Sequence, residues 1–255
     1  MFDAHLVPRG LSEEDLETLH VFGVTQALVP TRELEGGSSA AALRKEFENV
    51  LEKQLPRLAR HGISGHAGIG IPAASLPARG LRELLNALPE VLAHPRAVAV
   101  GALGLWKGTP AEEEALLAQL AIAARFARPA LVSALARGGV ERVRKLLVCV
   151  RKAPLPPARV LIDGCDAATV GAVRALGFNA GLSLHPDFLT AERAVKLVAR
   201  LGAEQVILGS RAGESAGDLL ALPRAAHLLG KAGLSRAVVD RVTRANAAAL
   251  FGAAV

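Results

Sequence analysis

The chain has 255 residues, 51% of them hydrophobic, and a mean hydropathy of +0.32. This length suits one large α/β domain, and the apolar content suits strands that are buried on both faces. The net charge of +6 and pI near 9.9 would also fit a nucleic-acid binder. However, the arginines are scattered along Ala- and Leu-rich helices and aromatic residues make up only 3%, so nucleic acid is not expected as a partner.

The sequence also bears on the cellular compartment. No apolar run approaches the roughly 20 residues that cross a bilayer, so no membrane partner is expected. The start lacks the charged and apolar regions of a signal peptide. The two cysteines, Cys149 and Cys165, show neither a disulfide framework nor a metal-type spacing. These features predict a cytoplasmic protein.

Eight short apolar segments alternate with longer helical patterns along the chain. This alternation predicts parallel strands joined by right-handed helical crossovers. Eight such strands predict a single (β/α)8 TIM-type barrel, an α/β fold over residues 1–255, with an additional C-terminal helix over 235–252. The predicted strands are 2–6, 25–30, 64–71, 97–103, 129–135, 159–164, 179–184 and 205–210.

The helical segments carry recognisable ends. Ser12 is predicted to cap the first helix, with Glu14 in its first turn, where a carboxylate suits the helix dipole. Thr109 is predicted to cap a later helix with Pro110 at its first position, and Gly202 to end another. An open doubly wound sheet is the alternative fold. "GHAGIG" lies inside a strand, however, and lacks the loop-to-helix context of a nucleotide-binding fingerprint.

In a barrel of this kind the active site lies at the carboxyl ends of the strands. The first strand supplies Asp3 and His5 there, the sixth supplies Asp163, and the eighth supplies Ser210 and Arg211. These residues are therefore the candidates for binding or catalysis.

Three stretches at these strand ends resemble signatures of the TatD-like metal-dependent hydrolases, a family of amidohydrolase-like barrels. They are "FDAHLVP", "VGALGL" and "RPALVSALAR", which are similar to D-x-H-x-H, V-G-E-x-G-L and P-V-x-x-H. The second half, from "VLIDGCDAATVG" to "GDLLALPRA", runs parallel to an archaeal-type TatD-related subgroup. The resemblance covers nearly the whole chain and implies a metal-dependent hydrolase of phosphoester or amide bonds.

Carried over residue by residue, the resemblance leaves few of the metal ligands in place. Asp3 and His5 match the first-strand ligands and form a remnant of a metal site. The other ligand positions fall on Val7, Ala102, Ser133, Gly164 and Arg211. Two ligands do not hold a catalytic zinc, which usually keeps three protein ligands and a water. The degenerate site therefore predicts no cofactor.

Arg211 adds a positive charge where the family has a cation. A guanidinium stays protonated, so it would repel a metal ion. We expect Arg211 to form a charge-assisted hydrogen bond with Asp3 or Asp163 instead. The alternative is a divalent metal (Zn, Mn or Mg) held by a rearranged set in which His66, Asp163 or His185 joins Asp3 and His5.

The turn after the eighth strand, within "LGSRAGESAGDLLALP" (208–223), is rich in glycine. Loops after strands 7 and 8 often bind phosphate in barrels, and Ser210, Arg211 and Gly213 are the candidates for an anion site here. The alternative is that the glycines serve only the turn, while Asp218 serves the first turn of the following helix.

Three functions follow from these observations. The first is a pseudoenzyme that acts as a binding or scaffold protein for a small anionic ligand or a protein partner. The second is a metal-dependent hydrolase with a rearranged site. The third is a metal-free enzyme that uses Asp163, Cys165 and Arg211 on an anionic substrate. A nucleophilic Cys165 needs a base and an electropositive setting, without which it is an inert buried thiol.

Overall fold

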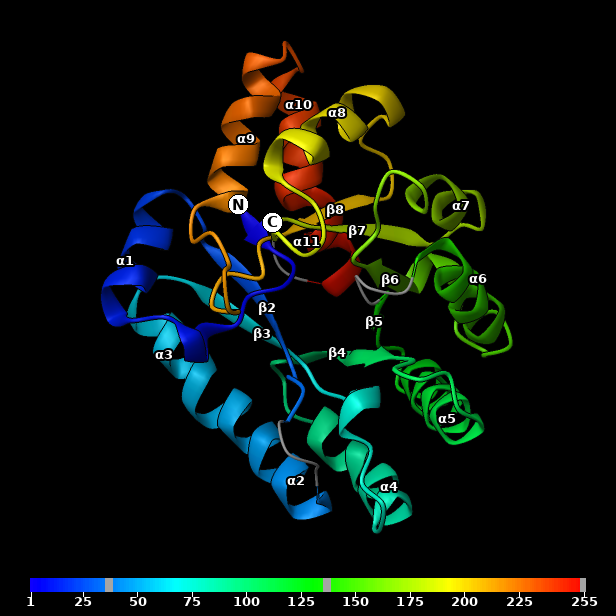
Figure 1. Ribbon diagram of the computed structural model, residues 1–255. Helices are drawn as coiled ribbons and strands as arrows, with labels where there is room; N and C mark the ends of the chain where they lie inside the picture. The colour runs from blue at the N-terminus through cyan, green and yellow to red at the C-terminus, as the bar shows by residue number, and fades with distance from the viewer. Residues whose placement is uncertain (35–38, 135–138, 253–255) are drawn as a thin grey trace.

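Eight parallel strands form the centre of the computed structural model, which describes residues 1–34, 39–134 and 139–252. They pair in chain order from β1 to β8, and helices surround them (Figure 1). The predicted (β/α)8 TIM-type barrel is confirmed. The strands are β1 (Phe2–Asp3), β2 (Gln26–Pro30), β3 (Ser64–Gly68), β4 (Ala97–Gly104), β5 (Ala130–Ser133), β6 (Val160–Asp163), β7 (Asn179–Ser183) and β8 (Val206–Gly209).

Backbone hydrogen bonds bring the first and last strands together. The Ala4 N–H donates to the Leu208 carbonyl at 3.3 Å, and the Arg211 N–H donates to the His5 carbonyl at 2.8 Å. These bonds nearly close the barrel and place the residues after β1 against those after β8.

Most strands are shorter than predicted. The segment predicted as 2–6 is regular only over Phe2–Asp3, because residues 4–6 make single bonds to β2 and β8 instead of a continuous ladder. The segment predicted as 64–71 ends at Gly68, where the register between β3 and β4 shifts. The prediction 129–135 reaches residue 135, which lies outside the described residues; β5 is regular over Ala130–Ser133.

The helices begin and end with the predicted residues where caps were expected. The Ser12 side chain accepts a hydrogen bond from the Asp15 N–H, and the Thr109 hydroxyl accepts one from the Glu112 N–H. Gly202 follows the last helical residue of α8 with a φ of 78°. The α-helices are α1 (Glu13–Val21), α2 (Ala40–Asn49), α3 (Leu55–Arg60), α4 (Leu81–Leu92), α5 (Pro110–Arg125), α6 (Gly139–Val150), α7 (Val170–Ala175), α8 (Ala191–Leu201), α9 (Ala221–Lys231), α10 (Arg236–Asp240) and α11 (Asn246–Phe251).

The chain also contains short 3-10 and π-helical segments. The predicted C-terminal helix over 235–252 is confirmed, but it contains a π turn, η5, between α10 and α11. Among the described helices, none combines the length and apolar character that spanning a membrane requires. The 3-10 segments are η1 (Pro8–Gly10), η3 (Ala73–Ser75) and η4 (Pro157–Arg159), and the π segments are η2 (Val50–Gln54) and η5 (Arg241–Ala245).

The apolar interior of the barrel is closed at its amino-terminal end by the C-terminal helix. The Phe251 ring of α11 meets the Phe2 ring of β1 edge-on, with the ring centroids 6.0 Å apart. Both rings belong to one buried cluster with Leu28, Leu131 and Ile207. The helix does not cover the opposite end of the barrel, at the carboxyl ends of the strands. We call this end the mouth of the barrel.

Replacing Phe251 with Ala should lower the free energy of unfolding by about 3–5 kcal/mol, because it leaves a cavity beneath the barrel interior. Urea denaturation monitored by circular dichroism measures the change. Val148→Ala is the matched control, since Val148 is 55% exposed and its loss should change stability by less than about 0.5 kcal/mol. Equal effects of the two substitutions would contradict the role of Phe251 as a plug.

Candidate functional site

Polar side chains from four strands meet at the mouth of the barrel. Strand β1 and its extension provide Asp3 and His5, β6 provides Asp163, β7 provides Ser183, and β8 is followed by Ser210 and Arg211. All six are buried, and the 30%-exposed side chain of Glu214 lies at their outer edge. We call these residues the mouth cluster: Asp3, His5, Asp163, Ser183, Ser210, Arg211 and Glu214.

Arg211 is the centre of this cluster. Its Nη2 donates to Asp163 Oδ2 at 2.8 Å, its Nε to Ser183 Oγ at 2.9 Å, and its Nη1 to Glu214 Oε1 at 2.8 Å. The Ser183 hydroxyl in turn donates to Asp163 Oδ1 at 2.8 Å. The sequence offered Asp3 or Asp163 as the partner of Arg211, and the structure pairs it with Asp163.

His5 joins the same network at Asp163 Oδ2, the oxygen that Arg211 also contacts. Its Nδ1 lies 2.9 Å from Asp163 Oδ2. An ionised carboxylate only accepts hydrogen bonds, so Nδ1 carries the proton in this contact. The other ring nitrogen, Nε2, lies 3.6 Å from Glu214 Oε1. His5 is therefore oriented by two carboxylates that also contact Arg211.

Asp3 has a separate set of partners. Its Oδ1 accepts hydrogen bonds from the Ser210 N–H at 2.9 Å and the His5 N–H at 3.1 Å, and its Oδ2 accepts one from the Ser210 hydroxyl. These bonds tie β1 to the end of β8. Asp3 thus helps to close the barrel. The side chains of Asp3 and His5, which were predicted to be the remnant of a metal site, bond to different partners.

The surroundings of the two buried carboxyl groups, Asp163 and Asp3, shift their pKa values in opposite directions. Burial by itself raises the pKa of Asp163, but the Arg211 charge together with hydrogen bonds from His5 and Ser183 outweighs it and lowers the pKa below its usual value. Burial dominates at Asp3 and raises its pKa, although hydrogen bonds from Ser210 and His5 act in the opposite direction. Asp163 is therefore held as the anion that pairs with Arg211.

Two of the positions where the resemblance implies further metal ligands, Ala102 and Gly164, have no side-chain atom that could bind a metal. Ala102 packs on the apolar cluster of the barrel interior. A Cβ at Gly164 would lie 2.8 Å from the Phe188 ring, whose face is 4.3 Å from the Arg211 guanidinium carbon. Within residues 1–34, 39–134 and 139–252, no group of three His, Cys, Asp or Glu side chains is arranged to hold a metal ion. The residues of the mouth therefore do not fit a catalytic metal.

The histidines that were candidates for a rearranged metal site lie in different environments. His66 packs edge-on against Phe2, with the ring centroids 5.6 Å apart, and its buried Nε2 has no hydrogen-bond partner in the part of the chain that the structure describes. His185 accepts a hydrogen bond from the Asp187 N–H at 3.2 Å through Nδ1, so its Nε2 is the donor to the Ser215 carbonyl at 2.8 Å. Both nitrogens of His185 are thus satisfied by the backbone.

Cys165 belongs to the apolar core rather than to the mouth cluster. The residue is fully buried, and its thiol donates to the Ile162 carbonyl at 3.1 Å. Burial, reinforced by the negative charges of Asp163 and Asp166, raises the pKa of Cys165. These conditions disfavour the thiolate that a nucleophile requires, so Cys165 fits the inert thiol of the sequence analysis.

Each residue of the predicted anion site is already engaged in contacts with other residues of the chain. Arg211 is neutralised by Asp163 and Glu214, and the Ser210 hydroxyl bonds to Asp3 and accepts from the Ala212 N–H at 2.9 Å. Gly213 has a φ of 93°, and a Cβ there would lie 1.9 Å from the Val7 carbonyl oxygen. These contacts favour the alternative in which the glycine serves the turn.

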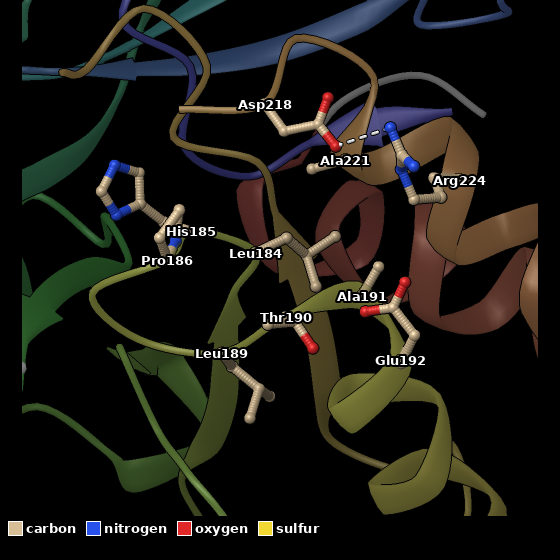
Figure 2. Close-up of a pocket in the computed structure, with 10 residues that line it drawn as sticks. All are labelled: Leu184, His185, Pro186, Leu189, Thr190, Ala191, Glu192, Asp218, Ala221 and Arg224. Carbon is tan, nitrogen blue, oxygen red and sulfur yellow. Dashed lines mark ion pairs between the residues drawn. The ribbon is translucent and has the colours of Figure 1, made fainter. Parts of the chain in front are cut away.

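A cavity of about 210 Å³ lies beside the mouth, between the starts of α8 and α9 (Figure 2). Asp218 and Arg224 form an ion pair across it at 3.1 Å, and Asp218 also accepts from the Leu220 N–H at 3.0 Å. The ring of His185 is turned away from this pair in Figure 2. Asp218 was predicted to serve the first turn of the following helix, but α9 begins at Ala221 and has no acidic residue in its first turn, so Asp218 belongs to the turn that precedes the helix.

Sequence reasoning missed Ser183, Glu214 and Phe188. Ser183 lies one residue before the end of the predicted strand 179–184, so its position at the mouth was available from the same rule that selected Asp163. Glu214 lies three residues after Arg211, a spacing that brings side chains together only in a helical turn. No pattern in the sequence indicates that Phe188 lies against the guanidinium.

Comparison with known proteins supports the fold. No family model and no curated protein matches the sequence. Solved structures do match: a TatD-like protein from Archaeoglobus fulgidus superimposes with a TM-score of 0.83 and 23% identity, covering 99% of this chain and 100% of that chain. The fold is that of a TatD-like barrel.

Two further solved structures share this barrel fold. A phosphotriesterase homology protein from Escherichia coli, complexed with phosphate in its active site, has a TM-score of 0.75 and 18% identity over 98% of both chains. A TatD homolog from Escherichia coli has a TM-score of 0.66 and 18% identity, covering 99% of this chain and 98% of that chain.

Arg211→Met should lower the free energy of unfolding by about 3–5 kcal/mol, because it leaves the buried Asp163 carboxylate without its cation. The double substitution Arg211→Met with Asp163→Asn should recover part of this loss. Arg142→Met on the exposed face of α6 is the matched control and should have little effect. A double variant as unstable as the sum of the two single variants would contradict the pairing.

The same ion pair should make stability depend on pH. The pKa of Asp163 is lowered in the folded state, so its stabilising effect is complete above the unfolded-state pKa of about 3.9 and is lost as the pH falls below it. The advantage of wild type over Asp163→Asn, measured by urea unfolding between about pH 6 and pH 3, should therefore shrink in acid. A difference that stays constant would show that the Asp163 charge does not stabilise the fold.

Proposed function

We propose that residues 1–255 form a single TatD-like barrel without hydrolase activity, which acts in the cytoplasm as a binding or scaffold protein. One observation carries the proposal. The Arg211 guanidinium contacts Asp163, Ser183 and Glu214 at the strand ends where the resemblance implies a divalent metal. A fixed cation with three hydrogen-bond partners opposes the binding of a second cation at the same place.

The remaining candidates for chemistry support the same proposal. His5 would be the natural general base, but both of its ring nitrogens face carboxylates within the cluster. Asp163 is neutralised by Arg211 and does not face an open position. The fully buried Cys165 lacks the setting of a nucleophile. The mouth cluster is thus suited to hold the barrel together and not to activate water.

Metal loading followed by an activity assay tests this proposal. The purified protein is incubated separately with Zn²⁺, Mn²⁺ and Mg²⁺, dialysed, and analysed by plasma mass spectrometry. Hydrolysis of bis(p-nitrophenyl) phosphate is then followed in the presence of each metal. We expect no stoichiometric metal after dialysis and no metal-dependent hydrolysis above the blank.

The variants His5→Ala and Asp163→Asn identify the source of any hydrolysis. Metal retained at one ion per chain, with hydrolysis that both variants abolish, would contradict the proposal. Hydrolysis that is unchanged in both variants comes from a contaminating enzyme and agrees with an inactive barrel. Circular dichroism checks that each variant is folded before the assay.

A further inference from the structure

A larger cavity, of about 510 Å³, lies at the opposite end of the barrel from the mouth cluster. It is bounded by the end of α3, which precedes β3, and by the segment that precedes β4, so it belongs to the amino-terminal side of the strands. We call it the basal pocket. Its lining residues are Leu51, Glu52, Leu55, Pro56, Ala59, Arg60, His94 and Arg96.

A π turn forms one wall of the basal pocket. The segment η2 (Val50–Gln54) widens the helix between α2 and α3, immediately before Pro56. Proline has no N–H for the carbonyl four residues earlier, and its ring clashes with that carbonyl in a regular α-helix. The π turn relieves this clash, and such turns often occur at functional sites. Leu51 and Leu55 supply apolar surface to this wall.

The charges of the basal pocket are not balanced as those of the mouth are. Within the described residues, neither Arg60 nor Arg96 forms an ion pair, and the side chain of Arg96 makes only a long hydrogen bond of 3.5 Å to the Gly65 carbonyl. His94 accepts from the Arg96 N–H through Nδ1 at 3.1 Å, so its proton lies on Nε2. That Nε2 faces Glu52 at 3.9 Å.

We propose that the basal pocket binds a small organic phosphate. Arg60 and Arg96 line this cavity, and neither guanidinium pairs with a carboxylate among the described residues, so both can donate charge-assisted hydrogen bonds to a phosphate dianion. The imidazole N–H of His94 is a further donor at the same rim. The apolar surface of Leu51, Leu55 and Ala59 accommodates the organic part of the ligand. The size of the cavity suits a small molecule.

The negative charge of Glu52 would repel a bound phosphate, so removing this charge should change the affinity in a predictable direction. Its carboxylate lies at the rim with a side-chain exposure of 68% and reaches His94 only at the limit of an ion pair. A dianion in the pocket would meet this negative charge. Glu52→Gln should therefore tighten phosphate binding, whereas a scattered, non-specific affinity for arginines would not respond to one carboxylate.

Calorimetric titration with phenyl phosphate at low ionic strength tests the proposal. We expect saturable binding with one site per chain. Arg60→Gln and Arg96→Gln should each weaken it about tenfold, because each removes a charge-assisted hydrogen bond. Arg142→Gln, which removes the same charge from the exposed face of α6, should leave the affinity unchanged. Ala59→Glu, at an exposed position of α3, should abolish binding.

Several results would overturn the assignment. The basal pocket is not the site if the binding of phenyl phosphate fails to saturate. The same conclusion follows if phenyl phosphate binds Arg142→Gln as weakly as it binds Arg60→Gln. Binding lost in Arg211→Met but kept in the Arg60 and Arg96 variants would move the ligand to the mouth. Inorganic phosphate that binds as tightly as phenyl phosphate would contradict the role of the apolar wall. Circular dichroism confirms the fold of each variant.

Discussion

The ion pair between Asp163 and Arg211 organises the mouth of this barrel. Both side chains are nearly inaccessible to solvent, and their contact is 2.8 Å long. A buried charge is costly unless it is paired and hydrogen-bonded, and here Ser183, His5 and Glu214 complete the bonding of both groups. Because these residues bond to one another, they form one connected network around the ion pair.

The arginines of the mouth and those of the basal pocket differ in whether a carboxylate neutralises them. At the mouth and in the neighbouring cavity, Arg211 and Arg224 are neutralised by carboxylates. In the basal pocket, Arg60 and Arg96 have no carboxylate partner among the residues described. Two arginines that line one cavity without a carboxylate partner among the described residues thus lie at the end of the barrel where active sites are seldom found.

Part of the mouth cluster was predictable, and the reason is the regularity of the fold. Parallel strands end at the same edge, so Asp163 and Arg211 were expected to meet as soon as both were placed at strand ends. The choice between Asp3 and Asp163 was not predictable. It depends on Ser210, which uses its N–H and hydroxyl to hold Asp3 away from the guanidinium. The third partner, Glu214, reaches Arg211 through a turn whose shape rests on the contact of Gly213 with Val7.

Local periodicity and short-range hydrogen bonds are enough to predict the alternation of strands and helices, the caps at Ser12 and Thr109, and the C-terminal helix. The partners within the mouth and the existence of the basal pocket depend on contacts between residues far apart in the chain. His5 and Asp163 are 158 positions apart, and such a contact is set by packing of the whole barrel. The basal pocket likewise requires α3 and the segment before β4 to lie side by side, which no local pattern specifies.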